Sequence, residues 1–130
     1  MLFRSKMRVV ADRHLEALAH ARTAGVTLAC GTDFGTSGAG SLAPHGTNGV
    51  ELGHLVAAGL TPLEAIEAAT ANGPLTLGPQ APHSGVLAEG YDADVIALDA
   101  DPLADIGALR DGSHVTRVWK AGRLVKGAAP

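Results

Sequence analysis

The sequence predicts an α/β fold over residues 1–84 and a β-rich part over residues 85–130. Three observations support this prediction. A helix-like segment, a glycine and an apolar run follow one another near the N-terminus, which is the order found in folds with parallel strands. Two helix-start patterns then occur between residues 48 and 64. After Ser84 the chain changes to short apolar runs separated by turn residues, which favours β-strands.

The first helix is predicted over residues 12–24, with Asp12 as its N-cap. Leu15 and Leu18 fall on one face of this helix. Gly25 suits the position just after a helix, where the backbone often turns left-handed. The run VTLAC that follows at once predicts a short buried strand, and a long loop comes after it.

Two further helices are predicted before residue 74. The first, NGVELGHLVAAG at 48–59, begins with Asn and has Glu three residues later, which is similar to a capping box. The second begins at Thr61, which precedes a proline at the first helical position, and Glu64 completes another capping box. The Gly-Pro pair at 73–74 is expected to end this helix.

The C-terminal part is predicted to contain strands within GVLAEGYDADVIALDAD (85–101). The segment DPLADIGAL (101–109) predicts one short helix or a turn. The chain then predicts a β-hairpin that pairs 115–119 with 123–125 around a turn at 120–122. We therefore expect two structural units that meet near residue 84.

The charges are unevenly distributed along the chain. The net charge is −3, which argues against a general nucleic-acid binder. No Lys or Arg occurs from residue 23 to residue 109, whereas ten acidic residues do. An acidic middle of this kind indicates either a preference for cations or a solvated acidic face, and the sequence leaves both open.

Cysteine content and hydropathy bear on the compartment of the protein. Cys30 is the single cysteine, so an internal disulfide is excluded, and its apolar surroundings favour a buried, reduced thiol. No run reaches the ~18 apolar residues of a membrane span. The N-terminal residues lack the apolar core of a signal peptide. We expect a soluble, cytoplasmic protein that interacts with neither membranes nor nucleic acids.

Several common sites do not fit the glycine-rich loop CGTDFGTSGAG at 30–40. Its glycines do not match a dinucleotide fingerprint or a P-loop, and no Lys lies nearby. A triad of Ser37 or Ser41 with His45 and Asp33 lacks the G-x-S-x-G turn that exposes a nucleophile. None of the six histidines forms an H-x-H or H-x-x-x-H pair, so a metal site made wholly by this chain is not indicated.

Asp33 is the remaining candidate for a functional residue in this predicted loop. It follows the predicted strand directly, and in a parallel α/β barrel the catalytic groups lie at the C-terminal ends of strands. A carboxylate there can hold a metal ion and exchange a proton with metal-bound water. Local spacing is equally compatible with an Asp that caps a loop by hydrogen bonds.

Four segments, taken in order, are similar to the C-terminal part of the metal-dependent amidohydrolase superfamily. They are AGVTLACGTDFG (24–35), HGTNGVELGHLVAAGLTPLEAIEAATANG (45–73), SGVLAEGYDADVIALDADPLADI (84–106) and VWKAGRLVKG (118–127). Together they cover the chain from about residue 8 to residue 127. Within the superfamily they most resemble the branch of imidazolonepropionase-like and Xaa-Pro dipeptidase-like enzymes.

The resemblance implies an incomplete fold. Residues 1–84 would form the last βα units of a TIM barrel, and residues 85–130 the C-terminal strands of a small composite β-sandwich. A barrel strand without neighbours leaves backbone N–H and C=O groups unpaired, and helices without a barrel expose apolar faces. We therefore expect either large apolar patches or a partner, which would be the missing N-terminal portion or a complementary chain.

The resemblance also implies a metal site that this chain would only partly supply. Asp33 of the GTD motif would be a metal ligand and the proton-shuttling acid/base, and His45 would contact substrate. The metal would be zinc or another divalent ion. The remaining ligands of the family, an H-x-H on the first strand, a Lys or Glu on the fourth and histidines on the fifth and sixth, would lie outside this chain.

These implications define the expected activity. The complete enzyme would hydrolyse an amide or peptide-like C–N bond of a small molecule or dipeptide with metal-activated water. Two alternatives apply to the 130 residues by themselves. One is a catalytically inert fragment, and the other is one half of a split enzyme whose partner supplies the histidine ligands.

Overall fold

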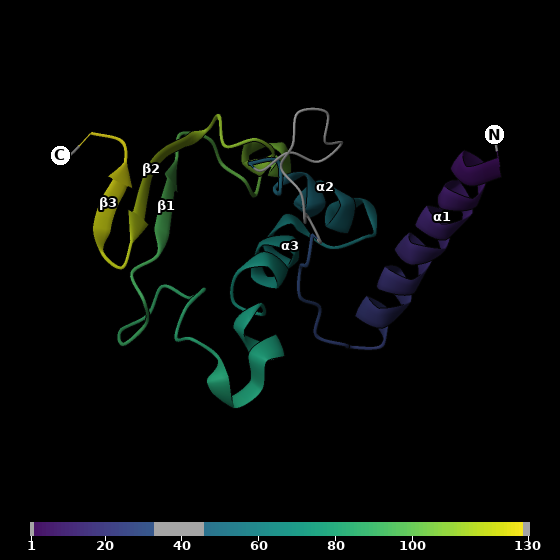
Figure 1. Ribbon diagram of the computed structural model, residues 1–130, viewed down its shortest axis with the longest axis horizontal. Helices are drawn as coiled ribbons and strands as arrows, with labels where there is room; N and C mark the ends of the chain where they lie inside the picture. Colours follow the sequence, from purple (N-terminus) through teal and green to yellow (C-terminus); the bar gives the residue numbers. More distant parts are fainter. Residues whose placement is uncertain (1, 33–45, 129–130) are drawn as a thin grey trace.

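The computed structural model describes residues 2–32 and 46–128, although among residues 2–12 only Val10 has a described side chain. Helix α1 (Leu2–Thr23) lies at one end of the molecule and a three-stranded sheet at the other (Figure 1). Helices α2 (Val50–Ala57) and α3 (Pro62–Ala69) lie between them. In the described residues all three α-helices precede the three strands, whereas the sequence predicts a strand at 26–30 within an α/β part.

Helix α1 is longer than predicted, and its start at Asp12 was wrong. No Gly or Pro interrupts Leu2–Thr23, so the helix continues upstream of Asp12. Its predicted end is confirmed. Gly25 has φ +74°, its N–H donates to the Arg22 carbonyl over 3.0 Å, and the Val26 N–H donates to the Ala21 carbonyl over 2.9 Å. These bonds form a Schellman motif.

The predicted strand at 26–30 is an extended segment that pairs with no strand in the described part of the chain. It lies against α3 instead. The Cys30 N–H donates to the carbonyl of Ala68 in the last turn of that helix. The strand predicted at 26–30 is therefore wrong for the described residues, because no neighbouring strand is present there to form a β-ladder with it.

The two central helices differ in how their N-termini are capped. At α3 the predicted capping box is confirmed: the Glu64 N–H donates to Thr61 Oγ1 over 3.2 Å, and the Thr61 N–H donates to Glu64 Oε2 over 2.7 Å. At α2 the predicted box is wrong, because Gly49 is the N-cap and no side chain caps the helix. The side chain of Asn48 is bonded elsewhere.

The stop predicted at Gly73-Pro74 also needs correction. Helix α3 already ends at Ala69, because Thr70 leaves helical geometry with φ −125° and ψ −82°. A turn follows, and Pro74 then begins the 3₁₀ segment η1 (Pro74–Gln80). The proline therefore opens an element here, at a position where its missing N–H costs no bond.

The core is small and aliphatic. Leu52 and Leu55 of α2 pack with Leu60 and with Ala65 and Ala68 of α3. The two alanines are the most completely buried, and no large side chain in the described residues is fully buried. This agrees with the 3% aromatic content, because few bulky side chains are available to fill a core.

Strands β1 (Val95–Leu98), β2 (Val115–Lys120) and β3 (Arg123–Lys126) form an antiparallel sheet in sequence order. The predicted hairpin is confirmed and extended by one residue on each strand. Ala121 and Gly122 form its two-residue turn with φ +49° and +74°, the signs of a type I′ turn.

The predictions made from the sequence were less accurate for the residues between the helices and the hairpin. The stretch predicted to contain several strands holds only β1 among the described residues. The segment at 101–109 contains the short 3₁₀ helix η2 (Ile106–Leu109), which packs on α2. The unit boundary near residue 84 stays a prediction.

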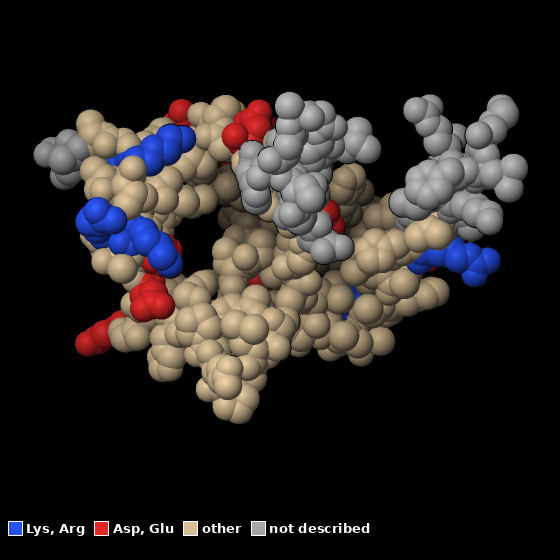
Figure 2. Space-filling model, viewed as in Figure 1, with Lys and Arg blue, Asp and Glu red and all other residues tan. Residues whose placement is uncertain are grey.

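Large apolar side chains lie at the surface of several elements. They occur on α1, on the extended segment, on α3, along η1 and the loop after it, on the sheet, and between β1 and η2 (Val10, Val26, Leu63, Leu75, Leu77, Val86, Leu87, Tyr91, Ile96, Leu103 and Val125). Figure 2 shows an opening between the sheet and the helical body.

Candidate functional site

The candidate site lies where the extended segment ends and α2 begins. Cys30 and Thr32 at the end of the segment face Asn48, Gly49 and Leu52 across an open hollow of about 260 Å³, which Ala69 closes. Asn48 Nδ2 donates to Thr32 Oγ1 over 3.2 Å. This bond joins residues on the two sides of the segment 33–45, and it engages the Asn48 side chain that would otherwise be free to cap α2.

Two hydrogen bonds fix the extended segment on α3 and on the turn after it. The Cys30 N–H donates to the Ala68 carbonyl over 2.8 Å, and Asn72 Nδ2 donates to the Leu28 carbonyl over 2.9 Å. Leu28 and Cys30 also pack against the core. Sequence reasoning missed Asn72, whose only signal was its place in the ATANG motif after the helix. The backbone that leads up to Thr32 is therefore held by hydrogen bonds at Leu28 and Cys30.

Cys30 is half-buried rather than fully buried. Burial raises the pKa of its thiol, and the negative charge of Glu51 raises that pKa further. Both effects disfavour the thiolate, which is the nucleophilic form. Cys30 therefore acts as a small packing residue at the edge of the hollow.

Asp33 and His45, the predicted metal ligand and substrate contact, lie outside the described residues. Ser37 and Ser41, the alternative nucleophiles, lie outside them too. The structure describes the residues next to this segment, which are Thr32 on one side and the turn from residue 46 on the other.

The described residues do not by themselves fit a metal centre. No group of three His, Cys, Asp or Glu side chains is close enough to hold an ion in the part of the chain that the structure describes. His114 Nδ1 lies 2.8 Å from Asp99 Oδ1, but this is an exposed pair on the sheet. A metal held near residue 33 would need most of its ligands from elsewhere.

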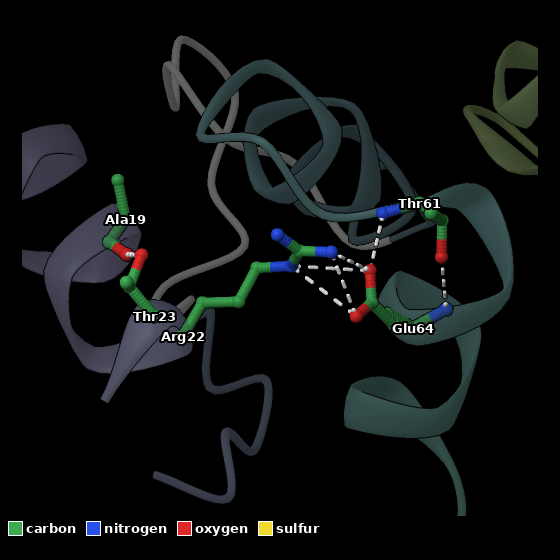
Figure 3. Close-up of polar contacts among 5 residues, drawn as sticks. All are labelled: Ala19, Arg22, Thr23, Thr61 and Glu64. Carbon is green, nitrogen blue, oxygen red and sulfur yellow. Dashed lines mark hydrogen bonds and ion pairs between the residues drawn. The ribbon is translucent and has the colours of Figure 1, made fainter. Parts of the chain in front are cut away.

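Two acidic side chains, Glu64 and Asp94, form ion pairs that stabilise local structure. Glu64 accepts bonds from both Nε and Nη2 of Arg22, with distances of 3.0–3.2 Å (Figure 3). The Thr61 N–H and the Arg22 guanidinium lower the pKa of Glu64 to about 2. Asp94 accepts a bond from the Ala121 N–H and pairs with Lys120, which lowers the pKa of Asp94.

A comparison of the sequence with protein-family models identifies the family. Residues 3–125 match the model of the amidohydrolase family. The chain belongs to this family. Among the described residues of this amidohydrolase chain, no helix is both long and apolar enough to cross a membrane.

Curated relatives support the branch predicted from the four motifs. Ochratoxinase of Aspergillus niger is 52% identical over 124 residues, which cover 95% of this amidohydrolase chain and 24% of the ochratoxinase. Imidazolonepropionase of Rubrobacter xylanophilus is 42% identical over 67 residues, which cover 52% of this chain and 16% of the relative. The chain therefore spans a quarter or less of these relatives.

Solved structures agree with the sequence matches. The crystal structure of A. niger ochratoxinase has a TM-score of 0.83 at 50% identity and covers 96% of this chain and 27% of its own. A Xaa-Pro dipeptidase with bound methionine in the active site has a TM-score of 0.71 at 32% identity, covering 87% of this chain and 25% of its own. The resemblance to both predicted enzyme types is confirmed.

Proposed function

We propose that this chain is the C-terminal portion of a metal-dependent amidohydrolase that hydrolyses an amide or dipeptide-like C–N bond in a small molecule. The observation that carries the proposal is the 52% identity with ochratoxinase over 124 residues, together with the TM-score of 0.83. Other similar structures are a prolidase and molinate hydrolase. These relatives have in common that each is named as a hydrolase of a small substrate.

The proposal assigns residues 1–84 to the last βα units of a TIM barrel and residues 85–130 to strands of a β-sandwich. Asp33 is proposed as a metal ligand and as the group that carries the proton, and His45 as a weaker substrate contact. Zinc or another divalent metal would supply an activated water when bound. The anchoring of the segment before Asp33 supports this assignment, because a catalytic carboxylate must be held in a fixed position.

The remaining ligands are proposed to come from outside the 130 residues, since the described residues do not form a donor set. They would lie on a missing N-terminal portion or on a complementary chain. The chain by itself is accordingly proposed to be inactive. This second proposal is favoured by the coverage of 24% of ochratoxinase, because three quarters of that fold has no counterpart here.

The test combines this chain with the part of A. niger ochratoxinase that the match does not cover, produced as a separate polypeptide. Hydrolysis of ochratoxin and of Xaa-Pro dipeptides is measured, together with bound zinc. We expect turnover only when both polypeptides and metal are present. Stoichiometric zinc and turnover by the 130-residue chain alone would refute the requirement for a second part.

Two variants test the role of Asp33. Asp33→Asn should abolish turnover in the reconstituted enzyme, because the amide cannot take up the proton, and it should weaken zinc retention. Asp92→Asn is the matched control, since Asp92 is an exposed acid in a loop of the β-rich part. Equal activity of the two variants would exclude Asp33 from the chemistry.

A further inference from the structure

We infer that Asn48 is a positioning residue for the hydrolysis proposed above: its side-chain amide holds Thr32, the residue directly before Asp33 in the sequence. The inference rests on the proposed function, because it takes Asp33 as the carboxylate that must be held in place. It goes beyond that function by naming the side chain that fixes the neighbouring residue. Asn48 itself acts through Thr32 and needs no contact with the substrate.

The bond between Asn48 and Thr32 is the hydrogen bond nearest to residue 33 on the described side of the segment. Asn48 Nδ2 donates to Thr32 Oγ1 over 3.2 Å, and the two residues are 16 positions apart. Upstream, hydrogen bonds from or to the backbone hold the chain at Leu28 and at Cys30. Two residues further on, within the part of the chain that the structure describes, Thr32 is held by Asn48.

Asn48 stands on a rigid support. Its carbonyl accepts the Glu51 N–H over 3.1 Å in the first turn of α2. Beside it, the backbone of Gly49 lies so close to the Leu109 carbonyl that no Cβ would fit between them. Because other contacts fix the backbone on both sides of the bond, the bond can hold the Thr32 side chain in one place relative to α2.

The bond to Thr32 brings little stability that a cap would not also bring. The N-cap of α2 is Gly49, and no side chain caps the helix, although Asn48 lies next to it and asparagine is among the best capping residues. A side-chain cap stabilises a protein about as much as one ordinary hydrogen bond does. The Asn48 side chain is also exposed. A departure from a local rule without a gain in stability is expected at functional positions.

The test uses a fused chain in which this chain replaces the matched region of A. niger ochratoxinase, with hydrolysis of ochratoxin as the assay. Asn48→Ala removes the donor, and Thr32→Val removes the acceptor but keeps the shape of the side chain. Each should lower kcat at least about tenfold with little change in KM, as loss of a group that orients an active-site residue typically does. The double variant should be no slower than either single variant, because all three remove the same bond.

Two controls separate positioning from folding. Thr32→Ser keeps the hydroxyl and should retain the wild-type kcat. Thr116→Val removes a threonine hydroxyl that donates to the Ala97 carbonyl over 3.1 Å on the sheet, and it should leave kcat unchanged. The urea midpoints of all variants should stay close to that of the wild type. If Asn48→Ala unfolds, the comparison of Thr32→Val with Thr32→Ser decides.

A second readout needs no activity. In the NMR spectrum of the 130-residue chain, Thr32→Val should shift the side-chain amide resonances of Asn48, whereas Thr32→Ser and Thr116→Val should leave them in place. Resonances of Asn48 that do not respond to Thr32→Val would show that the bond is absent in solution, and the inference would be overturned.

The outcomes separate the inference from the proposed function. A fused chain without substitutions that hydrolyses nothing would refute the proposed function, and the role of Asn48 would fall with it. An active fused chain whose kcat is unaffected by Asn48→Ala and Thr32→Val would overturn the inference alone. So would a loss of kcat that is matched by a fall in the urea midpoint, or losses that simply multiply in the double variant, because these results would give the bond a structural role.

Discussion

Two glycines of one helix should respond in opposite ways to the same substitution. Gly49 is the N-cap of α2, and a Cβ there would lie 1.8 Å from the Leu109 carbonyl oxygen and 2.7 Å from its carbon. Gly49 has φ −63°, so backbone strain does not contribute and the effect is steric. Gly53 lies in the helix interior, where a Cβ would meet no atom within 4 Å.

The cost at Gly49 follows from the clash with backbone. Cβ contacts under 3.0 Å essentially never occur, so the backbones of Gly49 and Leu109 must part by about 1.2 Å. That movement separates α2 from η2, whose Ala108 is buried. Overpacking of this kind costs about 1–3 kcal/mol or more. Gly53→Ala should instead stabilise by about 0.5–1 kcal/mol, because alanine restricts the unfolded chain and favours the helix.

Urea denaturation of the two variants measures the difference. Far-UV circular dichroism follows the helices, and the fluorescence of Trp119 in β2 follows the sheet. The two variants should differ by about 1.5–4 kcal/mol in the free energy of unfolding, the sum of the two effects. The reasoning fails if Gly49→Ala is as stable as the wild type, because the close approach of α2 and η2 would then not exist in solution.

Three further predictions concern the hairpin turn, the N-cap of α3 and the carboxylate of Glu64. Ala121→Asn should stabilise by about 1 kcal/mol, because Asn tolerates the positive φ of the hairpin turn better than Ala does, and an unchanged or lower melting temperature would argue against this turn. Thr61→Ala should destabilise by about 1 kcal/mol in urea denaturation by removing the cap of α3, and an unchanged midpoint would contradict that. Because the Thr61 N–H and the Arg22 guanidinium lower the pKa of Glu64 from 4.5 to about 2, its contribution is complete above pH 4.5 and is lost as the pH falls toward 2. Glu64→Gln should flatten the acid side of the stability profile, and a profile identical to the wild type's would show that neither the bond from Thr61 nor the pair with Arg22 contributes.

Sequence reasoning succeeded where a signal is completed within a few residues. The ends of α1 at Gly25, of α3 at Thr61 and of the hairpin at Ala121 are all closed by hydrogen bonds between near neighbours. It failed at Asn48, which has the spacing of a cap but bonds to Thr32, sixteen residues away. A side chain with several available partners takes the one that tertiary structure offers, and local spacing does not reveal that choice.

The candidate site was predictable only as a pattern of residues. The motif around Asp33 led to the amidohydrolase family, which the match over residues 3–125 confirms. The roles of Asp33 and His45 stay predictions, because both lie outside the described residues. Asn72 was missed because its function is to hold a backbone carbonyl 44 positions away. No local pattern encodes such a contact.

The three-stranded sheet carries apolar side chains on both of its faces. Val95, Trp119 and Leu124 are paired across the three strands and share one face, whereas Ile96 and Val118 share the other. Apolar residues on both faces are typical of a sheet that is covered on both sides. Yet the side chain of Ile96 is half exposed, and Figure 2 shows an opening between the sheet and the helical body. This exposure supports our proposal that the chain is one portion of a longer amidohydrolase.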